Sequence, residues 1–175
     1  MGQTPLSRRD LFSRFGGGGS KIRPPFSHPE ELFLDACTAC SKCIAACPQK
    51  ILVQGRGGYP EVNFAKAQCT FCGACAEACE ASAFAETRAP EDAWPVRAAV
   101  ADTCLEYHAV SCRACESWCD EDAIRFRPAL GGRSDIFIDT ARCTGCGACA
   151  TRCPQGALSI TQPGQIAPAD RKECA

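Results

Sequence analysis

Cysteine is the residue type whose number and spacing carry the chemistry of this chain. Of its seventeen cysteines, sixteen fall into four groups that share the ending Cys-x2-Cys-x3-Cys. Three groups have the full run Cys-x2-Cys-x2-Cys-x3-Cys, and they are Cys37, Cys40, Cys43, Cys47; Cys69, Cys72, Cys75, Cys79; and Cys143, Cys146, Cys149, Cys153. Thiolates at this spacing are typical ligands of cubane 4Fe-4S clusters. The three regular runs therefore predict iron–sulfur cluster binding.

The fourth group has a stretched first gap. Cys104 precedes Cys112, Cys115 and Cys119, and residues 105–111 are inserted after it. We expect a fourth 4Fe-4S cluster here, and thus four in the chain, although the insertion could displace Cys104 and leave an incomplete site. His108, inside the insertion, is an alternative ligand, but a solvent-facing histidine is the commoner reading of such a position.

The fourth cysteine of each run is predicted to leave its own cluster. Three thiolates on one tight loop reach three iron corners, and in two-cluster ferredoxins the next cysteine ligates the other cluster. The predicted ligand sets are Cys37, Cys40, Cys43 with Cys79; Cys69, Cys72, Cys75 with Cys47; Cys104, Cys112, Cys115 with Cys153; and Cys143, Cys146, Cys149 with Cys119.

Other uses of these cysteines fit less well. Zinc sites usually draw on two separated cysteine pairs rather than four thiolates within one short run. Disulfides are rare in reducing compartments. Cys174 lies in a polar tail and is interpreted as a free thiol. The sequence contains no Ser-His-Asp set, phosphate loop or dinucleotide fingerprint, so we expect no enzyme activity and no catalytic residue.

Composition indicates that bound metal stabilises the fold. Leu, Ile, Val and Phe make up about 17% of the chain, and the 46% hydrophobic content is largely Ala and Cys. The free energy of metal binding would then supply the stability that the few aliphatic side chains do not provide. The net charge of −1 argues against a nucleic-acid partner, and no stretch has the length of a transmembrane helix.

The chain reads as a tandem duplication with an α+β fold. Each half contains two cysteine runs with a hairpin between them, at residues 51–53 and 59–64 and again at 124–126 and 136–138. Short helices are expected over 74–79 and 148–153, and short strands over 84–85 and 157–160. The predicted domains are a flexible basic-apolar tail and Gly-rich linker (1–23), two bacterial ferredoxin-like two-cluster modules (24–89 and 90–163), and a polar tail (164–175).

The N-terminal tail allows two interpretations. Arg8, Arg9 and Arg14 flank Leu11, Phe12 and Phe15, which share one helical face, so the tail is either a partner-docking helix or a disordered terminus. Ser7-Arg8-Arg9 resembles a twin-arginine export signal, but the apolar segment that such a signal needs does not follow. We therefore expect a cytoplasmic protein.

Taken together, these features resemble the NapF family, the ferredoxin-type accessory proteins of periplasmic nitrate reductase systems. The resemblance rests on Ser7-Arg8-Arg9, Ile22-Arg23-Pro24-Pro25, Gly57-Gly58-Tyr59-Pro60, Val62-Asn63-Phe64, Cys104-Leu105, Tyr107, Cys112-Arg113, Ala123-Ile124 and Phe126-Arg127-Pro128. It implies a protein that binds the nitrate reductase catalytic subunit before export and assists its maturation, by supplying electrons or by helping to assemble its iron–sulfur cluster. A general electron-transfer ferredoxin and a cluster-bearing subunit of a membrane-associated complex are the alternatives. The tail favours the accessory role, and the lack of a membrane anchor counts against the third possibility.

Overall fold

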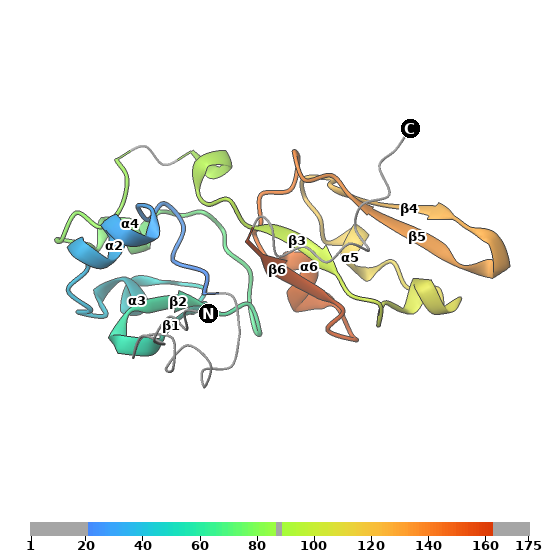
Figure 1. Ribbon diagram of the computed structural model, residues 1–175, viewed down its shortest axis with the longest axis horizontal. Coiled ribbons are helices and arrows are strands. Elements are labelled where there is room, and N and C mark those ends of the chain that lie inside the picture. The colour runs from blue at the N-terminus through green and yellow to red at the C-terminus, as the bar shows by residue number, and fades with distance from the viewer. Residues whose placement is uncertain (1–20, 87–88, 163–175) are drawn as a thin grey trace, which may run out of the picture.

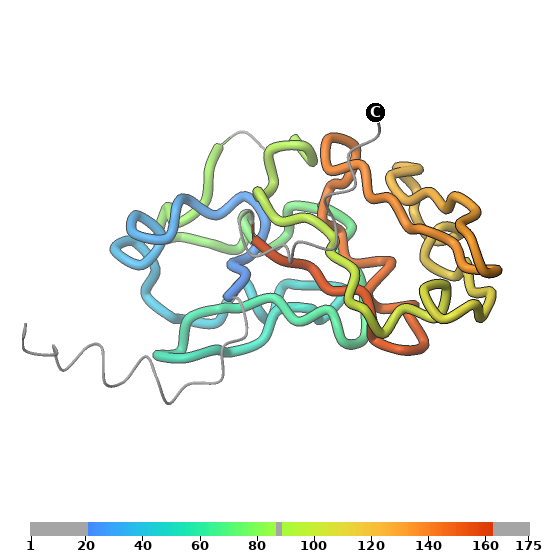
Figure 2. Tube along the Cα trace, turned by 45° about the vertical axis from the view of Figure 1, so that its right-hand side comes forward, coloured from blue at the N-terminus to red at the C-terminus, as the bar shows by residue number. Residues whose placement is uncertain are grey.

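Two lobes lie side by side along the long axis of the molecule. The structure, a computed structural model, describes residues 21–86 and 89–162. Figures 1 and 2 show the first half of the chain, blue to green, forming one lobe and the second half, yellow to red, forming the other. The predicted docking residues Arg8, Arg9, Leu11, Phe12, Arg14 and Phe15, and also Cys174, lie outside the described residues. No helix of the described part is long and apolar enough to cross a membrane.

Each lobe repeats one set of short elements. In the first lobe these are α3 (Lys42–Ala46), β1 (Leu52–Gln54), β2 (Pro60–Val62) and α4 (Ala74–Glu77). In the second lobe they are α5 (Ala114–Ser117), β4 (Ile124–Pro128), β5 (Ser134–Ile138) and α6 (Ala148–Arg152). The predicted hairpins are confirmed, since β1 pairs with β2 and β4 with β5, both antiparallel. The tight turns η1 (Arg56–Gly58) and η4 (Leu130–Gly132) close them, and each turn has a glycine at positive φ.

A third antiparallel pair belongs to the second lobe, where β3 (Arg97–Val100) pairs with β6 (Leu158–Thr161). The equivalent place in the first lobe has only an isolated bridge between Ser27 and Phe84, so the strand predicted over 84–85 was wrong. Its partner segment contains Pro24 and Pro25, which have no N–H to donate to a strand ladder. The remaining elements are α2 (Glu30–Ala36), η2 (Pro90–Asp92) and η3 (Leu105–His108).

The first lobe packs around Phe33 of α2, whose side chain is fully buried. Its ring meets Phe84 edge to face, with ring centroids 6.1 Å apart. Arg23 lies over the Phe33 ring and binds Glu30 through two hydrogen bonds of 2.7 and 2.8 Å, which lowers the pKa of the Glu30 carboxyl. Ile22 is also buried, so the packed part of the chain begins before the predicted tail boundary at residue 23.

Trp94 joins the two lobes. Its ring packs edge to face against Phe64 and Phe71 of the first lobe, with centroids 5.9 Å away in both cases. Its Nε1–H donates to the Thr144 carbonyl of the second lobe at 2.9 Å. The Thr151 hydroxyl donates to the Phe64 carbonyl at 3.0 Å and adds a second link. Because donors and acceptors come from both lobes, their relative orientation is specified by direct bonds.

Substitution of each tryptophan in turn tests how much the joint between the lobes contributes to the stability of the protein. We expect Trp94→Ala to destabilise the protein by about 3–5 kcal/mol, because it removes a buried ring. Trp94→Phe should cost less, about 1–2 kcal/mol, because it keeps a buried aromatic ring but removes the Nε1–H donor and part of the ring volume. Trp118 is the matched control: it is 46% exposed and contacts Arg152, so Trp118→Ala should cost less than about 1 kcal/mol. Guanidinium unfolding followed by circular dichroism measures the difference, and equal effects of the two alanine variants would contradict this role.

Candidate metal centres

Cysteines from two different runs surround one space in the first lobe. Cys37, Cys40 and Cys43 lie before and within α3, whereas Cys79 follows α4, and all four line the same small cavity. We call this set site A. Phe33 and Phe84 line the cavity as well, so the aromatic core of the lobe covers one side of the thiols. Burial raises the pKa of the Cys43 thiol to about 11.

Site B is formed by Cys69, Cys72, Cys75 and Cys47, again from two runs. Burial raises the pKa of the Cys69 thiol to about 11 and that of Cys75 to about 12. Among the nearby charges that act on both thiols are Cys47 and Cys72. The run that contributes three thiols to site A therefore contributes its fourth to site B.

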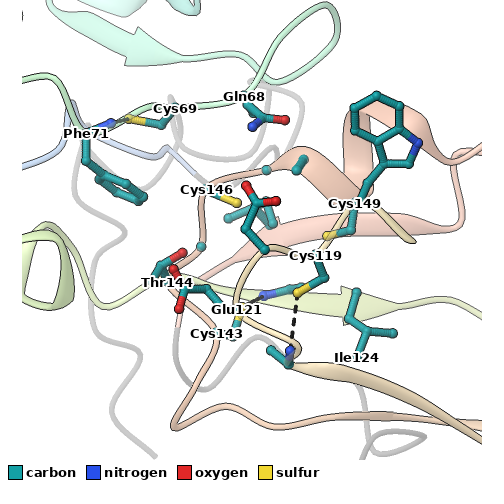
Figure 3. A pocket seen from close by; sticks show the side chains of 18 of the residues that line it. Gln68, Cys69, Phe71, Cys119, Glu121, Ile124, Cys143, Thr144, Cys146 and Cys149 are labelled. Atoms are coloured by element: carbon teal, nitrogen blue, oxygen red, sulfur yellow. Dashed lines mark hydrogen bonds between the residues drawn. The ribbon is translucent and has the colours of Figure 1, made fainter. Parts of the chain in front are cut away.

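Site C lies in the second lobe at the boundary with the first. Figure 3 shows Cys119, Cys143, Cys146 and Cys149 around the pocket, and all four line it together with Cys69 and Phe71 of the first lobe. Burial, together with the neighbouring thiols of Cys143 and Cys146, raises the pKa of the Cys149 thiol to about 12. A cluster at this site would thus be enclosed by side chains of both lobes.

Site D combines Cys104, Cys112 and Cys115 of the stretched run with Cys153 of the last run. Burial raises the pKa of the Cys115 thiol to about 12, with the largest charge contribution from Cys104 and another from Cys153. Cys104 is in turn influenced by Cys153 and Cys112. The structure thus places Cys104 near the other three thiols despite the insertion. His108 instead lies at the exposed surface, with Nε2 2.8 Å from the Asp102 carbonyl oxygen.

The four sets suit a cubane cluster better than a single ion. Zinc–sulfur bonds of about 2.3 Å would hold tetrahedral thiolates about 3.8 Å apart. Among residues 21–86 and 89–162, no three Cys, His, Asp or Glu side chains are gathered for one metal ion. The sixteen cysteines of this part are also free of disulfides. Four soft donors around a wider common space are the donor set of a 4Fe-4S cluster. The assignment of each thiol as a ligand remains a prediction.

The loops of the three regular runs share one backbone conformation. In each run the residue before the second cysteine and the residue after it have positive φ, namely Ala39 and Ser41, Phe71 and Gly73, and Gly145 and Gly147. The loop can therefore curl around the thiols. The stretched run departs from this pattern, because Arg113, directly after Cys112, has φ of −114°. Its ligand loop is consequently built in another way.

Backbone N–H groups point at several of the thiols. Ala123 donates to Cys119 Sγ at 3.3 Å, the bond drawn as a dashed line in Figure 3, and Ala157 donates to Cys153 Sγ at 3.2 Å. Both donors lie four residues after the sulfur that they contact. Ala98 of β3 donates to Cys143 Sγ at 3.5 Å. Such bonds stabilise a thiolate and tune the potential of a bound cluster. Sequence reasoning missed these alanines, although the repeated four-residue spacing was a usable signal for two of them.

Sites B and C are in direct backbone contact. The N–H of Cys69 donates to the carbonyl of Cys146 at 2.8 Å, which links one predicted ligand of each site. Phe71 and Trp94 pack beside this bond. The chain thus brings one site of each lobe together at the junction.

The first lobe exposes one thiol of each of its sites. Cys40 of site A and Cys72 of site B are exposed, and each is the second cysteine of its run. The pKa of the Cys40 thiol is lowered, chiefly by a hydrogen bond with the Lys42 backbone. Lys42 also forms an ion pair with Glu80 at 2.6 Å. Both sites therefore have an edge that a partner can approach.

Substitution of single cysteines tests the exchange of ligands between runs. We expect Cys40→Ser and Cys79→Ser to alter the same EPR signal of the reduced protein, because both belong to site A. Cys72→Ser and Cys47→Ser should both alter a second signal. Loss of one of four clusters removes about one quarter of the iron. Cys174→Ser is the control and should leave iron content and spectrum unchanged, whereas a shared signal for Cys79→Ser and Cys72→Ser would overturn the exchange.

Two family models match the chain, and both are described as a 4Fe-4S dicluster domain. One covers residues 36–84 and the other covers residues 110–157. Two dicluster domains in tandem bind four 4Fe-4S clusters, so the predicted number is confirmed. The second match begins after Cys104, which leaves most of the inserted loop outside it.

Proteins with similar sequences carry related names. The chain is 44% identical to the ferredoxin-type protein NapF of Escherichia coli over 156 residues, which cover 87% of this chain and 93% of that protein. It is 38% identical to NapF of Haemophilus influenzae over 79% of this chain and 78% of that protein. It is 33% identical to the methylamine utilization ferredoxin-type protein MauM of Paracoccus denitrificans, over 79% of this chain and 69% of that protein. On this similarity, which spans nearly the whole chain, the protein belongs to the NapF family of ferredoxin-type proteins.

Proposed function

We propose that this protein is a cytoplasmic accessory factor of a periplasmic nitrate reductase system, and that it supplies electrons to the catalytic subunit before that subunit is exported. In this proposal it is an electron carrier rather than an enzyme. Its two halves, 24–89 and 90–163, act as two ferredoxin-like modules of one carrier. The NapF relatives, together with a NapG relative from Haemophilus influenzae, support a place in this system.

The contact between sites B and C is the main observation that supports electron supply rather than cluster assembly. A protein that only handed over a cluster would not need sites of both lobes to touch. Here Cys69 and Cys146 share a backbone hydrogen bond, and Trp94 holds the surrounding loops. This arrangement suits transfer between the lobes without release to solvent.

Other residues at the sites have separate roles in this proposal. A bound 4Fe-4S cluster accepts and releases one electron at a time. The buried thiols, among them Cys75 and Cys149, exclude water from the sites, and the N–H groups of Ala123 and Ala157 stabilise negative charge on sulfur. Cys40 and Cys72 mark the accessible edges through which a partner can exchange electrons.

Two other functions have specific support. The exposed Cys40 and Cys72 also suit cluster assembly, because an accessible ligand can be displaced by an incoming thiol. The MauM relatives are named for methylamine utilization, which supports a more general ferredoxin role. The experiments below separate these possibilities.

Transfer assays with the catalytic subunit distinguish electron supply from cluster assembly. We expect the reduced, iron-loaded protein to reduce the cluster-containing catalytic subunit, while a cluster-free catalytic subunit acquires little iron from it. Stopped-flow absorbance measures the first reaction, and iron analysis of the re-isolated subunit measures the second. Iron transfer without reduction of the catalytic subunit would contradict electron supply and support cluster assembly. Equal reduction of an unrelated ferredoxin-dependent reductase would favour the general carrier.

Deletion of the tail tests the predicted docking segment. Removal of residues 1–15 takes away Arg8, Arg9 and Arg14 together with Leu11, Phe12 and Phe15. We expect the affinity for the precursor catalytic subunit to fall at least about tenfold, which is about 1.4 kcal/mol. Deletion of residues 164–175 is the control and should leave affinity unchanged. Calorimetry gives both values, and unaltered binding by the first deletion would reject docking by the tail.

A further inference from the structure

Glu106 is a buried carboxylate in the loop that stretches the third cysteine run. Its residue is 4% exposed, and it is the one charged residue that is buried among residues 21–86 and 89–162. A buried carboxylate is costly unless hydrogen bonds compensate it. Neither the dicluster match, which begins at residue 110, nor the cysteine pattern accounts for this residue.

The carboxylate of Glu106 binds one of the predicted ligands of site D. Its Oε1 accepts a hydrogen bond of 2.6 Å from the backbone N–H of Cys112. Hydrogen bonds to a charged acceptor are short and among the stronger ones in proteins. Cys112 is the residue at which the chain re-enters the cysteine run after the insertion, so this bond fixes the end of the loop.

Glu106 itself stands near the beginning of the same loop. It lies in η3, two residues after Cys104, where Tyr107 N–H donates to the Cys104 carbonyl at 3.1 Å. Burial raises the pKa of the Cys104 thiol, and hydrogen bonds with the backbones of Glu106 and Tyr107 oppose that shift. The loop is closed internally by a bond of 3.1 Å from Val110 N–H to the Leu105 carbonyl. The turn that directly follows Cys104 therefore also carries the side chain that binds Cys112.

The regular runs do not need such a residue. Their first two cysteines are three apart, and a residue with positive φ, such as Ala39 or Gly145, lies directly before the second. In the stretched run the positive φ has moved to Ala109, three residues before Cys112. The backbone turn that sets the spacing elsewhere is thus displaced, and a side-chain contact replaces it.

We propose that Glu106 is the positioning residue that makes the stretched run a complete cluster site, because its carboxylate holds Cys112 and it lies in the turn that directly follows Cys104. The insertion thus places a buried carboxylate next to a ligand of site D, whereas the carboxylates that line site C, Asp120 and Glu121, are exposed. A nearby negative charge lowers the reduction potential of a bound cluster. Glu106 thus combines a structural and an electrostatic effect on one site.

Two substitutions at Glu106 separate these effects, with Cys104→Ser identifying the EPR signal of site D. Glu106→Ala removes the acceptor, so we expect loss of that same signal and of about one quarter of the iron. Glu106→Gln keeps an oxygen acceptor for the Cys112 N–H but loses the charge. It should retain the iron, and the potential of that one signal should become more positive in an EPR-monitored redox titration.

Glu116→Ala and Glu116→Gln are the matched controls. Glu116 directly follows Cys115, but its side chain is 27% exposed and pairs with Arg113 at 3.6 Å. Both control variants should keep the full iron content and the potential of site D. The proposal is overturned if Glu106→Ala retains all of its iron, if it loses the signal of another site, or if Glu106→Gln shifts no potential. If Glu106→Ala fails to fold, the iron content and the redox potential of Glu106→Gln test the proposal.

Discussion

The predicted exchange of ligands between cysteine runs, which the grouping of the thiols supports, is the constraint on which the rest of this structure depends. A chain with so few Leu, Ile, Val and Phe residues cannot bury enough apolar surface to hold short helices and tight turns in place. Each site instead draws three thiols from one run and the fourth from the other run of the same lobe. A bound cluster therefore cross-links segments about thirty residues apart, and the free energy of cluster binding becomes free energy of folding. The small aromatic core around Phe33 and Phe84 covers the thiols rather than replacing them.

The same exchange explains the arrangement of secondary structure. The helices α3, α4, α5 and α6 end at or before the last cysteine of their runs, because that cysteine must turn toward the other site. Three residues later the chain has positive φ in every run, at Lys50, Ser82, Asp122 and Gly156. The hairpins carry the chain from the end of one run to the start of the next. Short elements are thus a consequence of the ligand geometry.

Contacts between the lobes bring a site of the first lobe and a site of the second lobe together. Trp94 belongs to the connection between them and bonds to the loop of site C, while Cys69 bonds to Cys146. The tight packing leaves no room for larger residues: a Cβ on Gly145 would lie 2.5 Å from the Val96 carbonyl oxygen, and one on Gly147 would clash with the Phe64 ring. Glycine at these positions serves the ligand loop and the junction together.

Sequence reasoning could predict the parts of this molecule that depend on local spacing. The three regular runs, the two hairpins and the number of clusters all follow from residues that are close in the chain. It missed α2 and β3, because their contacts are with segments far away in sequence, and it predicted a strand at 84–85 that Pro24 and Pro25 prevent. It also did not determine whether the insertion displaces Cys104, because no local pattern shows whether an inserted loop folds back.

By itself, the sequence determined the chemistry, because cluster ligation needs cysteines at fixed intervals and those intervals are visible along the chain. Only the tertiary structure decided which sites meet and where the inserted loop lies. The meeting of Cys69 and Cys146 depends on packing around Trp94, and the role of Glu106 depends on its burial and on a bond to Cys112. Burial and long-range contact are properties of the folded chain, so no spacing of residues could have shown them.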